Sequence, residues 1–245
     1  MMSDVDPATI EMVLGRFYAT MGRYHAHTLV GVEHIPPTGG VLGITTHGTA
    51  TYDLFLTAYA LYRETGRPIH MLGDAFWFKH PRSADLMGRL GMVLASPERA
   101  RRLLADGEVV AVAPGGMRAA MKIGKERYQV DWSGRSGFAR LALEAQRPIV
   151  LVTCPSADRV FTLYDNPLTR LAYRRWKLPL PIFRGLGPTL LPRPVRLITT
   201  ISPPINPPSI EGEAASDEEV FAFRAELEEG MNALIASACA REGLR

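Results

Sequence analysis

Apolar residues near the start of the chain recur with the period of an amphipathic helix. Between residues 7 and 24 they follow the i, i+3, i+4, i+7 rhythm, at Ile10, Val13, Leu14, Phe17, Met21 and Tyr24. Pro7 suits the first turn of such a helix. The pattern predicts an N-terminal amphipathic helix within residues 1–28. It either packs on the rest of the chain or, because Arg16 and Arg23 accompany it, lies in a membrane interface.

From residue 29 to residue 245, short apolar runs alternate with amphipathic stretches. Runs typical of buried strands occur at 41–46, 69–72, 92–95, 108–113, 147–154 and 195–205. Helical patterns occupy about 52–63, 82–90, 97–107, 134–146 and 216–240. Strands that alternate with helices predict an α/β fold, a single domain with a mainly parallel central sheet flanked by helices.

Composition agrees with a folded globular chain. Hydrophobic residues make up 47% of the 245 residues and charged residues 22%, enough to bury a sizeable core. The two cysteines provide no disulfide framework, and the start lacks a secretory signal, which together predict a cytoplasmic protein. No charge-free apolar stretch reaches the roughly 18 residues of a membrane span.

One part of the chain has basic residues but no acidic ones. Between Asp165 and Glu211 there is no acidic residue, whereas seven basic residues stand among aliphatic and aromatic ones: Arg170, Arg174, Arg175, Lys177, Arg184, Arg193 and Arg196. Such a stretch predicts peripheral contact with an anionic membrane surface, here the inner face of a membrane. Nucleic acid could also use this charge, but the proline-rich, aliphatic context favours lipid over nucleic acid.

Several common chemistries lack their motifs. The chain has no G-x-S-x-G, no G-x-G-x-x-G and no G-x-x-x-x-G-K-[ST], which disfavours nucleophile-elbow hydrolases, dinucleotide enzymes and P-loop proteins. His25 and His27 are close in sequence, but no further residues at ligand spacing complete a metal site. We therefore expect no metal.

His47 and Asp53 are the first candidate pair. His47 follows the apolar run 41–46, and ligands of open α/β sheets bind beyond the carboxyl ends of strands. Gly48 would allow a substrate to approach closely. Asp53, in the first turn of the next predicted helix, could orient the imidazole as a general base. Alternatively, Asp53 only stabilises the helix dipole and His47 is a solvated loop residue.

A glycine turn forms the second candidate. Pro114, Gly115, Gly116 and Arg118 follow the run 108–113 and should meet His47 at the same sheet edge. Outward-pointing backbone N–H groups with an arginine nearby suit a phosphate or a developing oxyanion. An ordinary strand-to-helix turn would have the same sequence.

Three segments together resemble a known superfamily. Residues 32–53, 113–118 and 134–152 are similar, in order and spacing, to the glycerolipid acyltransferases, which include the lysophospholipid acyltransferases. The nearest branch is the diacylglycerol acyltransferase type 2-like proteins, with a His-Gly pair in the first motif and P-G-G-x-R in the third. The resemblance covers about residues 30–205.

Two positions depart from the wider superfamily pattern. Five residues separate His47 from Asp53, where four are usual, and Gly115 stands where a glutamate is usual, with Arg118 kept. That glutamate and arginine normally help to hold an acceptor phosphate. The lost acid leaves the identity of the acceptor open.

The resemblance implies an O-acyltransferase with no resident cofactor. Acyl-CoA or an acyl-carrier thioester would be the donor, and a lipid hydroxyl, such as that of a lysophospholipid or acylglycerol, the acceptor. His47 and Asp53 would be catalytic, and the substrate-binding residues would be Gly48, Pro114, Gly115, Gly116 and Arg118. An acyl-thioester hydrolase and a non-catalytic lipid carrier are the alternatives, although a carrier needs neither His47 nor Asp53.

Overall fold

The computed structural model describes residues 5–46, 48, 52–115, 127–164, 182–210, 212 and 214–244. Within these ranges the main sheet has seven strands in the order β1-β9-β6-β2-β5-β3-β4. The strands are β1 (Thr28–Val30), β2 (Val41–Thr45), β3 (Ile69–Gly73), β4 (Met92–Leu94), β5 (Val109–Val112), β6 (Ile149–Thr153) and β9 (Ile198–Ile201). All neighbouring pairs are parallel except β6 and β9, which are antiparallel. The predicted α/β class with a mainly parallel sheet is confirmed.

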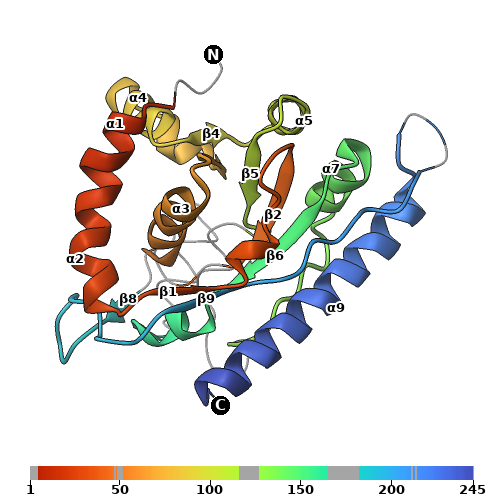
Figure 1. Ribbon diagram of the computed structural model, residues 1–245. Helices are drawn as coiled ribbons and strands as arrows, with labels where there is room; N and C mark the ends of the chain where they lie inside the picture. The colour runs from red at the N-terminus through yellow and green to blue at the C-terminus, as the bar shows by residue number, and fades with distance from the viewer. Residues whose placement is uncertain are drawn as a thin grey trace.

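Helices cover both faces of the sheet (Figure 1). The α-helices are α1 (Pro7–Ile10), α2 (Arg16–Tyr24), α3 (Tyr52–Thr65), α4 (Pro81–Arg89), α5 (Pro97–Ala105), α7 (Gly137–Ala145) and α9 (Asp217–Glu242). A π-helical segment, η1 (Glu11–Gly15), joins α1 to α2, and short 3₁₀ segments are η2 (Val32–His34), η4 (Ala75–Phe78) and η6 (Pro155–Arg159). The long α9 begins with a capping box between Ser216 and Glu219, which satisfies amide groups that the helix itself leaves free.

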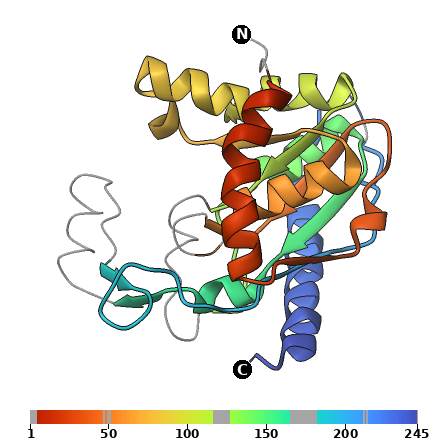
Figure 2. The same cartoon turned by 60° about the vertical axis from the view of Figure 1, so that its left-hand side comes forward.

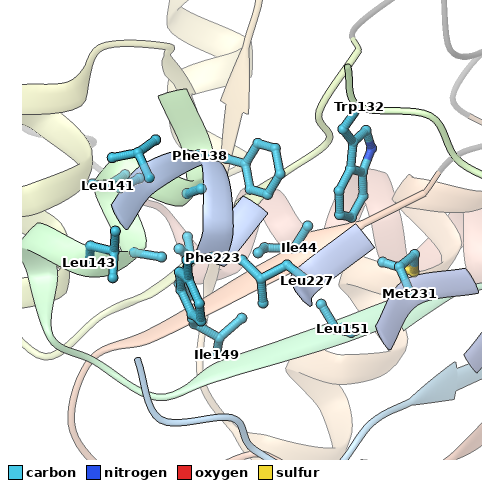
Figure 3. Packing of buried hydrophobic residues seen from close by; sticks show 14 of the residues in the cluster. Ile44, Trp132, Phe138, Leu141, Leu143, Ile149, Leu151, Phe223, Leu227 and Met231 are labelled. Carbon is cyan, nitrogen blue, oxygen red and sulfur yellow. The ribbon is translucent and has the colours of Figure 1, made fainter. Parts of the chain in front are cut away.

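The larger core lies between the sheet and helices α5, α7 and α9 (Figure 3). Ile44, Ile149 and Leu151 project from the sheet towards Phe223 and Leu227 of α9. Because side chains of a strand alternate between its two faces, this layer takes every second residue of β2 and β6.

The opposite face of the sheet is covered by α3, and the N-terminal helices pack on α3 in turn. Ile10 and Leu14 are buried against Tyr59 of α3 and Leu90 after α4. The apolar side of the N-terminal amphipathic helix therefore packs on the fold. A domain boundary at residue 28 stays a prediction.

A small second sheet stands out from the body. Strands β7 (Thr162–Tyr164) and β8 (Ile182–Arg184) pair antiparallel, with Leu163 opposite Phe183. In Figure 2 the cyan segment that contains β8 and the turn after it projects away from the main sheet. Phe183 packs on Phe161, with ring centroids 5.1 Å apart, which fastens the small sheet to the core.

Candidate active site

The two candidate loops leave neighbouring strands at the same edge. β2 and β5 are parallel partners with Ile44 opposite Val112, so the residues after each strand emerge side by side. Thr46 continues the pairing of β2, since its backbone N–H donates to the carbonyl of Val152 at 3.0 Å. This edge is where ligands bind in open α/β sheets.

Asp53 is buried close to Gly48, which follows β2. Its side chain is 3% exposed, and its Oδ1 accepts a hydrogen bond from the backbone N–H of Gly48 at 3.0 Å. A carboxylate in the first helical turn would favour α3 wherever it pointed. Here it reaches back across the loop to the residue directly after His47.

Gly48 is packed too tightly for a side chain. A Cβ at this position would stand 3.0 Å from the Cβ of Ala157 and 3.2 Å from its carbonyl carbon. The absence of a side chain therefore lets the loop lie against η6. The space beside Gly48 is filled by the protein itself on that side.

On the β5 side, Pro114 is buried and Gly115 has φ = 101°, a conformation that strongly favours glycine. The structure thus brings Gly48 and Asp53 into contact and sets Pro114 and Gly115 at the end of the adjacent strand. His47, Gly116 and Arg118 lie outside the described residues.

A hydrogen-bonded chain fixes the start of α3. The Tyr52 hydroxyl lies 2.9 Å from Nε2 of His25, and Nδ1 of His25 lies 2.7 Å from the carbonyl oxygen of Val195. A carbonyl can only accept, so Nδ1–H donates to Val195 and Nε2 accepts from Tyr52 in the neutral ring. Burial lowers the pKa of His25, which agrees with that form. The residue next to Asp53 is therefore held in place.

An apolar cavity lies between α3 and the sheet. It has about 610 Å³ of empty space, counting the part open to solvent. Thr45, Leu54 and Ala113 line it near the candidate site, and Ile69 and Val109 line it at the amino ends of their strands. From Val109 to Ala113 the strand covers about 13 Å at roughly 3.3 Å per residue.

The cavity exists because small residues occupy alternate positions along two strands. Gly43 on β2, with Ala111 and Ala113 on and after β5, faces α3, whereas Leu42, Ile44 and Val110 fill the opposite core. The period of two in these residues is visible in the sequence. Only the position of α3, however, identifies the small set as a cavity wall, so sequence reasoning missed it.

The nearby cysteine is not prepared to act as a nucleophile. Cys154 follows β6 and is buried; burial, with a smaller contribution from the Asp53 charge, raises the pKa of its thiol to about 12. A thiol in this state is almost entirely protonated at neutral pH, and the thiolate is the reactive form.

The described part of the chain contains neither a metal-binding cluster nor a membrane-spanning helix. No cluster of three or more histidine, cysteine, aspartate or glutamate side chains there is placed to hold a metal ion. Among the described helices, none combines the length and apolar composition needed to cross a bilayer.

The geometry and the sequence comparisons point to the same class. A family model described as "Acyltransferase" matches residues 27–154, a little over half of the chain, which includes both strand ends of the candidate site. The chain belongs to the acyltransferase family. The resemblance read from the sequence motifs is thereby confirmed at the level of the family.

Among curated proteins, the human "DGAT1/2-independent enzyme synthesizing storage lipids" is 29% identical over 205 residues, and the chicken protein of the same name is 30% identical over 205 residues. These alignments take in 82% of this chain but 61% and 59% of the two relatives. The chain thus spans about three fifths of their length.

A solved structure has the same fold. The 1-acyl-sn-glycerophosphate (LPA) acyltransferase PlsC from Thermotoga maritima superposes with a TM-score of 0.55 at 15% sequence identity. The match covers 92% of this chain and 81% of that one. At this identity the match establishes the fold, which is the acyltransferase-like α/β architecture that the motifs predicted.

Proposed function

We propose that the protein transfers a fatty acyl group from acyl-CoA, or from an acyl-carrier thioester, to a lipid hydroxyl such as that of a lysophospholipid or acylglycerol. The observation that carries this proposal is the buried Asp53 bonded to Gly48, next to an apolar cavity that Thr45 and Leu54 line. The carboxylate of Asp53 lies beside Gly48, the residue after His47, which supports a role for His47 as a general base. The apolar cavity suits an acyl chain. Steady-state thioester turnover with and without lipid acceptors tests it.

In the proposed reaction, Nε2 or Nδ1 of His47 takes the proton of the acceptor hydroxyl. The hydroxyl oxygen then attacks the thioester carbonyl carbon and forms the C–O bond of the ester. When the C–S bond breaks, the departing thiolate receives the proton from the His47 imidazolium. Asp53 stabilises that imidazolium and orients the ring. Direct transfer is supported by the protonated state of Cys154, since no thiolate is available there for a second thioester.

The carbonyl oxygen of the thioester becomes negative during attack and needs donors. Backbone N–H groups of Gly115 and Gly116 are our candidates, supported by the positive φ of Gly115 at the end of β5. Pro114 would fix the chain before this turn. Arg118 is proposed to bind a phosphate of the donor or acceptor.

A lipid acceptor also accounts for the predicted membrane contact. Lysophospholipids and acylglycerols partition into bilayers, so an enzyme that uses them benefits from binding a membrane surface. The acid-free stretch between Asp165 and Glu211 supports peripheral binding at an anionic inner face. Residues 165–181 of this stretch lie outside the described residues.

Replacing Arg118 tests the phosphate contact. We expect Arg118→Lys to raise KM for the phosphate-bearing substrate with a smaller change in kcat, because a point charge does not replace a bidentate guanidinium. Steady-state kinetics with each substrate varied in turn measures the effect. Arg135→Lys, an exposed arginine before α7, is the matched control and should change neither constant. Unchanged KM values in both Arg118→Lys and Arg118→Ala would assign Arg118 to structure instead.

Filling the cavity should shorten the acyl chain that is accepted. A Cβ on Gly43 would have no neighbour closer than 3.7 Å, so Gly43→Val fits and projects into the cavity. We expect kcat/KM for palmitoyl-CoA to fall roughly 10- to 100-fold relative to octanoyl-CoA, since two to three methylene groups lose about 0.8 kcal/mol of burial each.

The control for this change is Gly88→Val on α4, where a new side chain would meet nothing within 4 Å. It should leave the ratio of the two substrates unchanged. An unaltered ratio in Gly43→Val, in a protein with normal thermal unfolding, would show that the acyl chain binds elsewhere.

A further inference from the structure

The turn after β8 exposes three leucines. Leu186, Leu190 and Leu191 are 51%, 68% and 61% exposed, and the last two values are the largest among the exposed large hydrophobic residues of the described chain. Large apolar side chains gathered on one projecting element mark an interaction site more often than scattered ones do. In Figure 2 the turn stands clear of the main sheet.

Hydrogen bonds within the turn fix its backbone, so that the three leucine side chains stay exposed. Within it, the N–H of Gly185 donates to the carbonyl of Thr189 at 2.7 Å, and the N–H of Leu186 donates to that of Leu191 at 2.7 Å. The hydroxyl of Thr189 donates to the carbonyl of Leu186 at 2.7 Å. These bonds satisfy part of the backbone within the turn itself, which lowers the cost of placing the turn in an apolar phase.

The segment that follows the turn is fastened to the body of the protein. Arg193 donates to the carbonyl of Arg159 at 3.0 Å and to the hydroxyl of Thr162 at 2.5 Å. The hydroxyl of Tyr24, at the end of α2, donates to the carbonyl of Pro192 at 2.7 Å. The leucines therefore stand on a fixed support.

The charge around the turn is positive. Arg184 lies directly before the turn, with its guanidinium 5.7 Å from the ring centre of the half-exposed Tyr164. Arg196 follows the turn in the sequence and is exposed. The sequence has no acidic residue from 166 to 210. The turn therefore presents exposed leucines, with arginines and the aromatic ring of Tyr164 beside them. This arrangement complements an anionic bilayer, whose apolar lipid tails lie beneath negatively charged headgroups.

The support also connects the turn to the candidate active site. Phe183 at the base packs on Phe161, whose ring centroid is 6.4 Å from that of Tyr52, the neighbour of Asp53. An element inserted in a bilayer at the turn would therefore hold the mouth of the site close to the membrane surface.

We propose that the turn from Gly185 to Leu191, which we call the leucine turn, inserts its three leucines into an anionic lipid bilayer and so positions the active site on the membrane. This inference rests on the proposed function for its purpose, but insertion itself requires no turnover. The occupant is a lipid surface, and a protein partner would be an alternative outcome of the test.

Vesicle flotation tests the leucine turn. The variant Leu186→Ser/Leu190→Ser/Leu191→Ser should bind phosphatidylcholine vesicles with added phosphatidylglycerol at least about tenfold more weakly than the unaltered protein, because burying even one leucine is worth about a factor of ten. The matched control Met12→Ser/Phe221→Ser changes apolar residues that are 55% and 53% exposed on other elements. It should bind normally. Equal loss in both variants, or none in the triple variant, would overturn the proposal.

A label gives a second readout that does not depend on affinity. Both native cysteines are buried, so Leu190→Cys can be labelled selectively with an environment-sensitive nitrobenzoxadiazole dye. Its emission should shift to the blue on adding the anionic vesicles, whereas the same dye at Phe221→Cys should not respond. A dye at Leu190→Cys that stays in a polar environment on vesicle-bound protein would contradict insertion.

Activity separates the two proposals. With butyryl-CoA and a water-soluble short-chain acceptor, the triple serine variant should turn over at the normal rate, because neither substrate needs a membrane. If the unaltered protein transfers no acyl group to any acceptor but still inserts the labelled turn, the proposed function fails and the leucine turn stands. If acyl transfer is normal but the labelled turn does not insert, the proposed function stands and the proposal for the leucine turn fails.

Discussion

His47→Ala should lower kcat for acyl transfer by about 10²–10⁴, the contribution typical of a well-placed general base. The protein should remain folded, because a histidine that follows the end of a strand contributes little to the core. Binding of the thioester should also survive, since the proposed acyl cavity is lined by other residues, including Gly43 and Ala113. Steady-state transfer, thioester binding and thermal unfolding measure the three expectations.

The control is His80→Ala, an exposed histidine whose role in the structure is to cap α4. It should lose up to about 1 kcal/mol of folding free energy and no turnover. Near-normal turnover in His47→Ala would show that the proposed mechanism is wrong, whatever the family.

Asp53→Asn should reduce turnover by about 10²-fold while the fold is kept. The amide oxygen of asparagine can still accept the hydrogen bond from the N–H of Gly48, so the loop retains its support. The charge that stabilises the imidazolium is lost. Because His47 and Asp53 act as one unit, the double variant should be scarcely slower than His47→Ala alone.

Asp217→Asn on α9 is the matched control for the helix dipole. Asp217 also lies in the first turn of a helix, but its side chain is largely exposed and forms an ion pair with Arg140 at the surface. It should lose roughly 0.3–1 kcal/mol of folding free energy and leave kcat unchanged. If Asp53→Asn behaves in the same way as Asp217→Asn, Asp53 stabilises α3 and takes no part in the reaction.

The alternation of strands and helices was predictable because apolar residues recur with a different period in each kind of element. The runs at 41–46 and 147–154 are short and apolar, and they form β2 and β6. The stretch 216–240 has acidic residues at its start and helical length, and it forms α9. The strands β1, β7 and β8 were missed, since three residues establish no period; β4 is equally short but belongs to the apolar run 92–95, which was predicted. The antiparallel pairing of β6 with β9 depends on tertiary packing, which no local pattern encodes.

The candidate site was predictable only in part. The sequence predicted that the Asp53 carboxylate turns back toward the imidazole of His47. The structure shows its bond to Gly48, the next residue, while its catalytic role and substrate binding by Gly48 stay predictions. The close contact of Gly48 with Ala157 joins segments more than one hundred residues apart, and no motif announces it. The roles of His47, Gly116 and Arg118 stay predictions, as does substrate binding by Pro114 and Gly115.

The most direct test of the central claim is the steady-state turnover of palmitoyl-CoA, measured with and without a lysophospholipid or diacylglycerol acceptor, by following release of free CoA and formation of the acylated lipid together. The account predicts CoA release that depends on an acceptor lipid, matches the ester formed mole for mole, and is lost in His47→Ala. Equal CoA release without any acceptor, with free palmitate as the product, would contradict it and identify a thioester hydrolase.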